Sequence, residues 1–244
     1  MSIDVASSNN NVHEVLMKVP QITALFWVTK IFATTFGETA GDALSMSLNL
    51  GYLLSTFIFA TIFMGVVYLQ IKSKTYHPFL YWFAIIASTT VGTTLADFVD
   101  RSLGIGYVGG STILLSLVCI SLFIWYRIEG SILPHAVNHP RAELFYWLTI
   151  TFSQTLGTAL GDWSADTAGL GYTGGMVLFT GLIILIFVLY KFTHLSRTLL
   201  FWSAFVLTRP LGAVVGDFLD KPISSGGLDF SRFTASAILL VAII

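Results

Sequence analysis

The chain has 244 residues, of which 55% are hydrophobic and only 10% are charged. A soluble domain carries roughly a quarter of its residues as charged side chains, so this composition excludes a soluble globular protein. Twelve Lys and Arg against 13 Asp and Glu give a net charge of −1, which excludes the basic surface that nucleic-acid binding requires. The single cysteine, Cys119, excludes a disulfide framework and a thiolate metal site.

Residues 1–20 are polar and lack the apolar core of a signal peptide, so they predict a cytoplasmic tail before a membrane domain at 21–244. A helix needs about 20 residues to cross a bilayer core of about 30 Å. Eight segments meet or approach this length: 21–42, 52–71, 78–98, 107–127, 143–163, 173–190, 198–218 and 228–244. Because they do not alternate apolar and polar residues as barrel strands do, we expect an all-α polytopic membrane protein with eight transmembrane helices.

Lysines and arginines in the short connections predict the orientation. Seven fall on the side of the amino terminus, and only three fall on the other side, namely Arg101, Lys221 and Arg232. Both termini are therefore expected in the cytoplasm, with the protein in a bacterial cytoplasmic membrane. The two remaining basic residues of the twelve, Lys30 and Arg209, lie inside predicted spans.

Four tryptophans mark an internal repeat: Trp27, Trp82, Trp147 and Trp202. Ten residues after each one stands a glycine, and fifteen residues after each one stands an aspartate. This agreement predicts four tandem two-helix repeats, at about 21–75, 76–130, 141–195 and 196–244. Because each repeat has an even number of spans, all four are expected to be parallel, related by an axis along the membrane normal. Ten extra residues between the second and third copies suggest that copies one and two form one pair, and copies three and four another.

In this arrangement the chain resembles a bacterial membrane-protein family of unknown function. That family is built from four tandem repeats, each with two membrane spans and a characteristic tryptophan. The resemblance covers about residues 20–244. It implies the architecture and no activity, so a function has to be derived from the residues.

The odd-numbered spans carry a polar stripe, because residues four apart share one helix face. The stripe contains the residues predicted to line a substrate or ion pathway: Lys30, Thr34, Glu38, Asp42, Thr89, Thr93, Asp97, Gln154, Thr158, Asp162, Arg209 and Asp217. Charges within a span almost always face the interior or a watery cavity. We therefore expect the odd helices inside and the largely aliphatic even helices outside. Each Asp lies about 22 Å along the helix from its Trp, near the outer surface.

The favoured hypothesis is a secondary transporter for a small cation, including divalent metal ions, coupled to protons. Hard cations prefer oxygen ligands, which the carboxylates, hydroxyls and amide of the stripe provide. Glu38 and Asp42, one helical turn apart, are the candidate metal ligands. The expected partners are the lipid bilayer and the transported ion, with no nucleic acid; the sequence predicts no oligomeric state.

Two alternatives remain open. In the first, Lys30 and Arg209 bind an anionic or zwitterionic small molecule that is transported. In the second, the protein is a membrane scaffold or sensor that transports nothing, and the charges only hold the bundle together. An enzyme is not expected, because no nucleophile–base pair or cofactor fingerprint is present in the sequence, and no cofactor is predicted.

Overall fold

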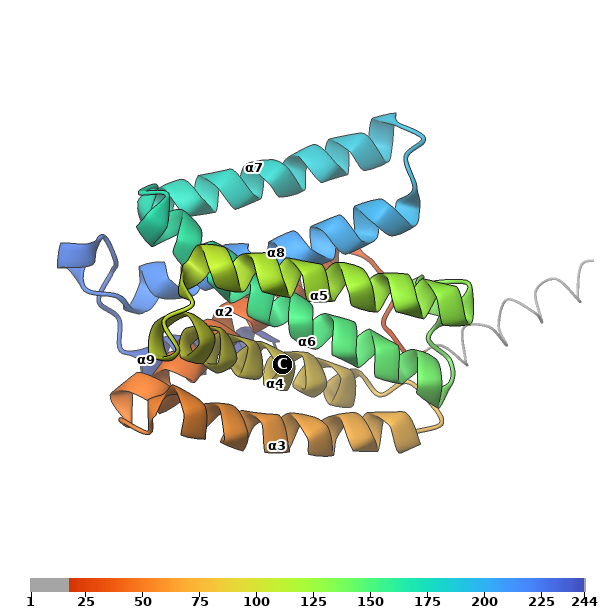
Figure 1. Ribbon diagram of the computed structural model, residues 1–244, viewed down its shortest axis with the longest axis horizontal. Helices are drawn as coiled ribbons and strands as arrows, with labels where there is room; N and C mark the ends of the chain where they lie inside the picture. Colours follow the sequence, from red (N-terminus) through yellow and green to blue (C-terminus); the bar gives the residue numbers. More distant parts are fainter. Residues whose placement is uncertain (1–17, 244) are drawn as a thin grey trace, which may run out of the picture.

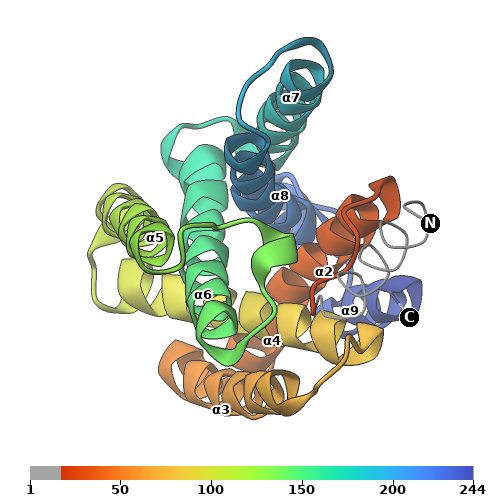
Figure 2. The ribbon, with the colours of Figure 1, turned by 90° about the vertical axis from the view of Figure 1, so that its right-hand side faces the viewer.

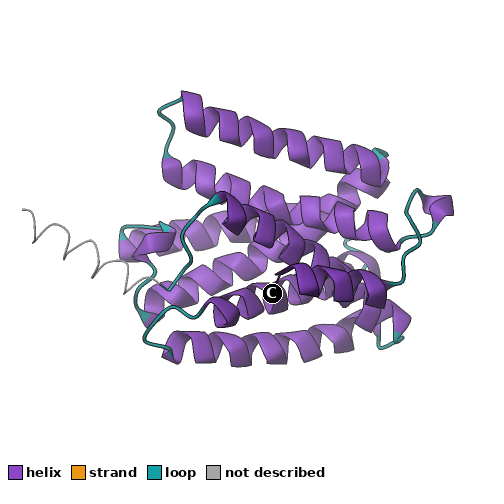
Figure 3. Cartoon of the chain, turned by 180° about the vertical axis from the view of Figure 1, so that it is seen from behind, coloured by secondary structure: helices purple, strands orange, loops and turns teal. Residues whose placement is uncertain are grey.

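The computed structural model describes residues 18–243, and most of the predicted tail therefore lies outside the described residues. The described chain consists of helices and the loops that join them (Figure 3), which confirms the all-α fold class and the eight predicted helices. The α-helices are α2 (Ala24–Asp42), α3 (Gly51–Lys72), α4 (Pro78–Asp97), α5 (Gly106–Glu129), α6 (Pro140–Asp162), α7 (Gly171–Phe192), α8 (Arg197–Asp220) and α9 (Arg232–Ile243).

Local sequence explains where the odd-numbered spans begin. Thr23 caps α2 by accepting a hydrogen bond from the Phe26 amide, and Ser196 caps α8 by accepting one from the Leu199 amide. The helices α4 and α6 begin at a proline, which has no N–H to lose in the first turn. These signals fix the starts of the four helices that carry the polar stripe.

Three of these helices end in the same way. After the repeated aspartate, α2, α4 and α6 continue into five-residue π-helical segments, Ala43–Ser47, Phe98–Ser102 and Trp163–Thr167. The chain then reverses through left-handed residues, such as Gly104 and Gly106 at φ 70° and 74°. Glycine adopts this backbone conformation without a steric penalty. The reversal starts α3, α5 and α7 directly beside the ends of the preceding helices.

The fourth repeat departs from this pattern, and the last helix is shorter than the predicted segment 228–244. Helix α9 begins only at Arg232, because the preceding residues pair with the end of α8. The amide of Leu228 donates to the Phe218 carbonyl at 2.8 Å, and that of Phe230 donates to the Leu219 carbonyl at 2.9 Å. At about 1.5 Å per residue, the 12 residues of α9 cover only part of a bilayer core.

The eight helices form two layers, seen end-on in Figure 2. The inner helices α2, α4, α6 and α8 each contact two inner neighbours, so they close a ring in the order α2, α4, α6, α8. Each outer helix packs on the inner helix that follows it in the chain: α3 on α4, α5 on α6 and α7 on α8, while α9 packs on α2. The helices are roughly aligned along the long axis of the molecule (Figure 1).

Burial separates the two layers. Five helical segments are long and apolar enough to cross a membrane: Gly51–Lys72, Pro78–Ser102, Gly106–Glu129, Gly171–Phe192 and Arg197–Asp220. Only 11% of the most apolar stretch of α3 and of α7 is buried, against 72% for α4 and α8. The exposed faces of the outer helices are aliphatic and aromatic, which suits contact with lipid. Helices α2 and α6 carry more polar residues, and these are buried in the ring.

Candidate functional site

The polar stripe of each inner helix lies inside the ring. Four layers of four residues can be distinguished, each with one residue from α2, α4, α6 and α8, and no member is more than 3% exposed. We name them by one member: the Lys30 layer (Lys30, Ile85, Ile150, Phe205), the Arg209 layer (Thr34, Thr89, Gln154, Arg209), the Glu38 layer (Glu38, Thr93, Thr158, Ala213) and the Asp42 layer (Asp42, Asp97, Asp162, Asp217). The structure thus places all twelve predicted pathway residues in the interior.

Glycines allow the inner helices to approach closely. The glycine ten residues after each tryptophan abuts the Arg209-layer residue of the next repeat: Gly37 by Thr89, Gly92 by Gln154, Gly157 by Arg209 and Gly212 by Thr34. A Cβ atom added to any of them would lie between 2.1 and 2.8 Å from the nearest atom of that neighbour. The same contact at all four interfaces gives the ring an approximate fourfold symmetry. Small residues commonly serve close helix packing in membranes, where lipid provides no hydrophobic drive between helices.

The Asp42 layer is held by two cations from the second and fourth repeats. Arg101, one turn after Asp97, lies 2.9 Å from that carboxylate through Nε and 3.2 Å from Asp162 through Nη2. Lys221, one turn after Asp217, lies 3.0 Å from that carboxylate and 2.6 Å from Asp42. Each cation therefore bridges two neighbouring inner helices, α4 with α6 and α8 with α2.

Lys221 lies just beyond the end of α8 and is largely buried. Burial alone lowers the pKa of its ammonium, but the nearby Asp217 and Asp42 carboxylates raise that pKa well above its ordinary value. The group consequently remains a cation at neutral pH, and the bridge between the two carboxylates persists.

One layer deeper, Glu38 pairs with Arg209 inside the ring. Arg209 donates through Nη2 to Glu38 Oε2 at 2.9 Å, to Thr93 Oγ1 at 2.7 Å and to Thr158 Oγ1 at 2.5 Å. Its Nε and Nη1 have no hydrogen-bond partner among the described residues, and neither has either amide atom of Gln154. One guanidinium thus joins all four inner helices, while the Arg209 layer retains unused donors and an unused acceptor.

Lys30 lies apart from this network. Its Nζ donates to the Phe205 carbonyl at 2.9 Å and to Thr208 Oγ1 at 2.5 Å, and it lies 3.9 Å from the centroid of the Phe205 ring. It forms no ion pair within residues 18–243.

The hydroxyls of Thr34 and Thr89 donate mainly to carbonyls of their own helices, Ile31 and Ile86, at 2.9 and 2.8 Å.

Carboxylate oxygens converge in two groups within the described chain. One oxygen from each of Glu38, Asp162 and Asp217 lies within 4.8 Å of the other two, and the same holds for Asp42, Asp217 and Asp220. Oxygens at that separation can share one ion, because Ca²⁺–oxygen bonds are about 2.4 Å long. The two metal ligands predicted from the sequence, Glu38 and Asp42, fall into different groups, and Asp217 belongs to both.

The opposite end of the ring is aromatic. Each tryptophan packs on the aromatic residue that precedes the tryptophan of the repeat before it: Trp82 on Phe26, Trp147 on Tyr81, Trp202 on Tyr146 and Trp27 on Phe201, with ring centroids 5.6 to 6.3 Å apart. Tyr81 and Tyr146 also share a hydrogen bond of 2.7 Å between their hydroxyls. This aromatic ring closes the interior on the side away from the aspartates.

Beside the aromatic ring lies an ion pair that the sequence did not indicate. Lys18 is 7% exposed and donates to Glu143 Oε1 at 2.5 Å and to the Ile71 carbonyl at 3.0 Å, while Gln70 donates to the Lys18 carbonyl.

The bridging roles of Arg101 and Lys221 were also missed, because both were counted as charges of the connections between helices. Their position, nineteen residues after Trp82 and Trp202 and one turn after an aspartate, is the signal that could have shown their pairing with that aspartate.

A comparison with known protein families identifies four repeats in the chain. A family described as "Repeat of Unknown Function (DUF347)" matches residues 25–76, 80–131, 145–196 and 200–244. The match confirms the resemblance to a family of four tandem repeats, and each matched segment contains one inner helix and the outer helix that follows it. No curated protein and no solved structure matches the chain.

Proposed function

Because the chain belongs to the DUF347 repeat family, whose description names no activity, we propose a function from the chemistry of its interior. The protein is a secondary transporter that carries a small cation, such as a divalent metal ion, across the membrane in exchange for protons. The observation that carries this proposal is the convergence of Glu38, Asp162 and Asp217, from three helices of one ring, within 4.8 Å.

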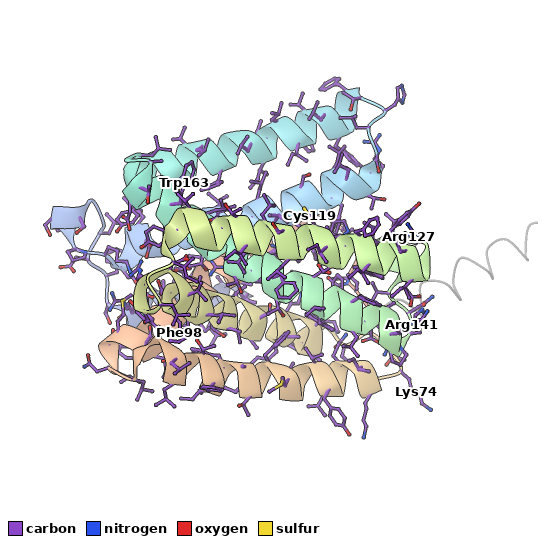
Figure 4. The ribbon with its side chains drawn as sticks, in the orientation of Figure 1. Lys74, Phe98, Cys119, Arg127, Arg141 and Trp163 are labelled. Carbon is purple, nitrogen blue, oxygen red and sulfur yellow. The ribbon has the colours of Figure 1, made fainter. Side chains whose placement is uncertain are left out.

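The ligand chemistry favours a hard cation. All three groups offer carboxylate oxygens, the ligands that Mg²⁺, Ca²⁺ and Mn²⁺ prefer. The Thr93 and Thr158 hydroxyls lie beside Glu38 through their contacts with Arg209, so further oxygens are at hand. Soft metal ions are disfavoured, since the single cysteine, Cys119, is exposed on α5 (Figure 4).

The charge balance of the two layers favours a doubly charged ion. The Glu38 and Asp42 layers contain five carboxylates, and the neighbouring Asp220 adds a sixth. Four cations pair with these six groups: Arg101, Arg209, Lys221 and Arg232. With all groups ionised, six negative and four positive charges leave a net charge of −2. One divalent cation or two protons neutralises this excess, which gives a physical basis for exchange of one for the other.

The proposed orientation places the aspartates toward the outside. Lys74, Arg127 and Arg141 lie at one end of the molecule, and Phe98 and Trp163, which directly follow repeated aspartates, lie at the other (Figure 4). Cytoplasmic connections are enriched in Lys and Arg, so the aromatic ring and the amino-terminal side of the chain face the cytoplasm. The bacterial cytoplasmic membrane is the proposed location. In this orientation the carboxylates receive the ion from outside, and the aromatic ring closes the inner end.

Flux through purified protein in proteoliposomes tests the proposal. We expect uptake of Mn²⁺, read by quenching of an internal metal-sensitive dye, together with movement of protons in the opposite direction. Glu38→Gln is expected to reduce the initial rate at least tenfold, whereas Asp166→Asn, which changes an exposed carboxylate at the same end, is expected to retain it. Equal rates in Glu38→Gln and Asp166→Asn, or no flux above empty liposomes, would overturn the proposal. The second result would favour the scaffold or sensor.

A second candidate is transport of an anionic or zwitterionic molecule bound by Lys30 and Arg209. The unused Nε and Nη1 of Arg209 beside the unused amide of Gln154 favour it. Lys30 supports it less, because its ammonium already donates to Phe205 and Thr208. Arg209→Lys discriminates between the candidates: it keeps the charge that a cation path requires but loses the planar fork that binds a carboxylate. Loss of amino-acid or organic-acid flux in Arg209→Lys with retained Mn²⁺ flux would assign the anion to this layer.

A further inference from the structure

A second group of carboxylates lies beside the first, on the side away from Arg209. It comprises Asp42, Asp217 and Asp220, each with one oxygen within 4.8 Å of the other two. Asp42 and Asp217 belong to the Asp42 layer, whereas Asp220 is the last residue of α8. All three are buried, with exposed fractions of 1, 3 and 6%.

Two of these buried carboxylates keep an unused oxygen. Asp42 Oδ1 and Asp220 Oδ1 have no hydrogen-bond partner within the described part of the chain. A buried polar atom without a partner costs free energy, and a charged one costs more. The second oxygen of each is already used, because Asp42 Oδ2 accepts from Lys221 and Asp220 Oδ2 accepts from Arg232. The group therefore keeps free oxygens where an ion could bind.

An ammonium group already lies within this cluster. Lys221 Nζ is 2.6 Å from Asp42 Oδ2 and 3.0 Å from Asp217 Oδ1. Arg232 Nε is 3.1 Å from Asp220 Oδ2 and 3.9 Å from Asp42 Oδ2. Three carboxylates thus face two cations, which leaves one net negative charge. Of the two cations, Lys221 has the flexible stem that can swing away when another cation arrives.

We propose that Asp42, Asp217 and Asp220 form a second cation site that loads the Glu38, Asp162 and Asp217 group, with Asp217 passing the ion from one to the other. Lys221 occupies the site as a tethered cation and is displaced by the ion. The ligand class is a hard divalent cation, since carboxylate oxygens are the ligands offered. This inference rests on the proposed function, because it assumes that the deeper group binds the transported ion.

Because Asp217 belongs to both carboxylate groups, an ion can pass from one group to the other while it stays bound to Asp217. A single carboxylate can bridge two positions for an ion only a few ångströms apart. An ion that moves between them exchanges Asp42 and Asp220 for Glu38 and Asp162 without losing Asp217. Complete release into the low-dielectric interior, which would be costly for a divalent ion, is thereby avoided.

Binding of Mn²⁺ to the purified full-length protein, followed by loss of the free-ion signal in electron paramagnetic resonance, tests the relay. In Glu38→Gln the deeper group loses a ligand, and we expect one Mn²⁺ per chain to remain bound. Adding Asp220→Asn or Asp42→Asn to this variant is expected to weaken binding at least tenfold. Adding Asp229→Asn, which changes an exposed carboxylate of the same connection, is expected to leave binding unchanged. Adding Lys221→Met is expected to tighten binding several-fold, because the competing ammonium is removed.

The outcomes separate the relay from the proposed function. If the native protein binds Mn²⁺ and folded Glu38→Gln binds none, the second site does not exist, while the proposed function stands. If the native protein binds no Mn²⁺, both fail. Weaker binding after Lys221→Met would also overturn the relay, because it would show that the ammonium does not compete with the ion for these carboxylates. A circular-dichroism spectrum equal to that of Glu38→Gln checks that each double variant is folded.

Discussion

Lys221, which follows the last inner helix, donates to Asp42 of the first inner helix at 2.6 Å and so links the two ends of the repeat array. Arg101 makes the equivalent connection from the second repeat to Asp162 of the third. The ion pairs therefore join copy four to copy one and copy two to copy three. The longer linker had suggested a different pairing, of copy one with two and of copy three with four.

The link between Lys221 and Asp42 is expected to contribute to stability. Both groups are largely buried, so removing one partner leaves an uncompensated charge. A double-mutant cycle with Lys221→Met and Asp42→Asn is expected to give a coupling free energy of about 1 to 3 kcal/mol in unfolding measured in detergent. A coupling below about 0.5 kcal/mol, the range of independent sites, would show that the contact does not hold the ring together.

The Glu38–Arg209 pair predicts that removing both charges restores part of the stability that is lost when only Glu38 is neutralised. Glu38→Gln leaves the fully buried guanidinium without its counter-ion and is expected to lower the free energy of unfolding by about 3 to 5 kcal/mol. The double variant Glu38→Gln with Arg209→Met removes both charges and is expected to recover at least half of that loss. Thermal unfolding of the three proteins measures the effect. A double variant that is less stable than Glu38→Gln would contradict the pairing.

Close packing at Gly157 predicts a steric penalty. A Cβ atom there would lie 2.1 Å from Arg209 Cγ and 3.0 Å from Pro210 Cδ, so Gly157→Ala is expected to destabilise the protein by about 1 to 3 kcal/mol. A Cβ atom added at Gly181, in the middle of α7, would meet no atom of the described residues within 4 Å. Gly181→Ala is the matched control and is expected to gain up to about 1 kcal/mol from helix propensity. Equal midpoints of unfolding would refute close packing at this interface.

The ion pair between Lys18 and Glu143, at the aromatic end of the ring, predicts that Lys18 protects the segment before α2 from hydrogen exchange. Its ammonium ties the segment before α2 to the end of α3 and the start of α6. Lys18→Met is expected to raise the hydrogen-exchange rate of residues 18–23 at least tenfold, because the segment loses its buried anchor, while exchange in α4 stays unchanged. Lys72→Met, which changes a lysine at the end of α3 outside this pair, provides the control. Unchanged exchange in Lys18→Met would show that Val19 packing and the hydrogen bond from Gln70 to the Lys18 carbonyl hold the segment without the ion pair.

The sequence predicted which residues face the interior better than it predicted which residues of different repeats contact one another. The offsets from each tryptophan identified Thr89, Gln154 and Asp217 as inward residues, because a helix repeats its face every four residues. The partners of these residues lie on other repeats, so no spacing along the chain could show that Lys221 reaches Asp42. The start of α9 was also missed, since it depends on the pairing of Leu228 with Phe218. The packing of Trp202 on Tyr146 depends in the same way on which helices become neighbours.

Anomalous diffraction from crystals grown with Mn²⁺ decides whether carboxylates from three inner helices bind one cation. We expect an anomalous peak between Glu38, Asp162 and Asp217, within about 2.5 Å of an oxygen of each, and no such peak in crystals of Glu38→Gln. Peaks confined to exposed acidic residues, with the interior of the ring occupied only by protein side chains, would contradict it.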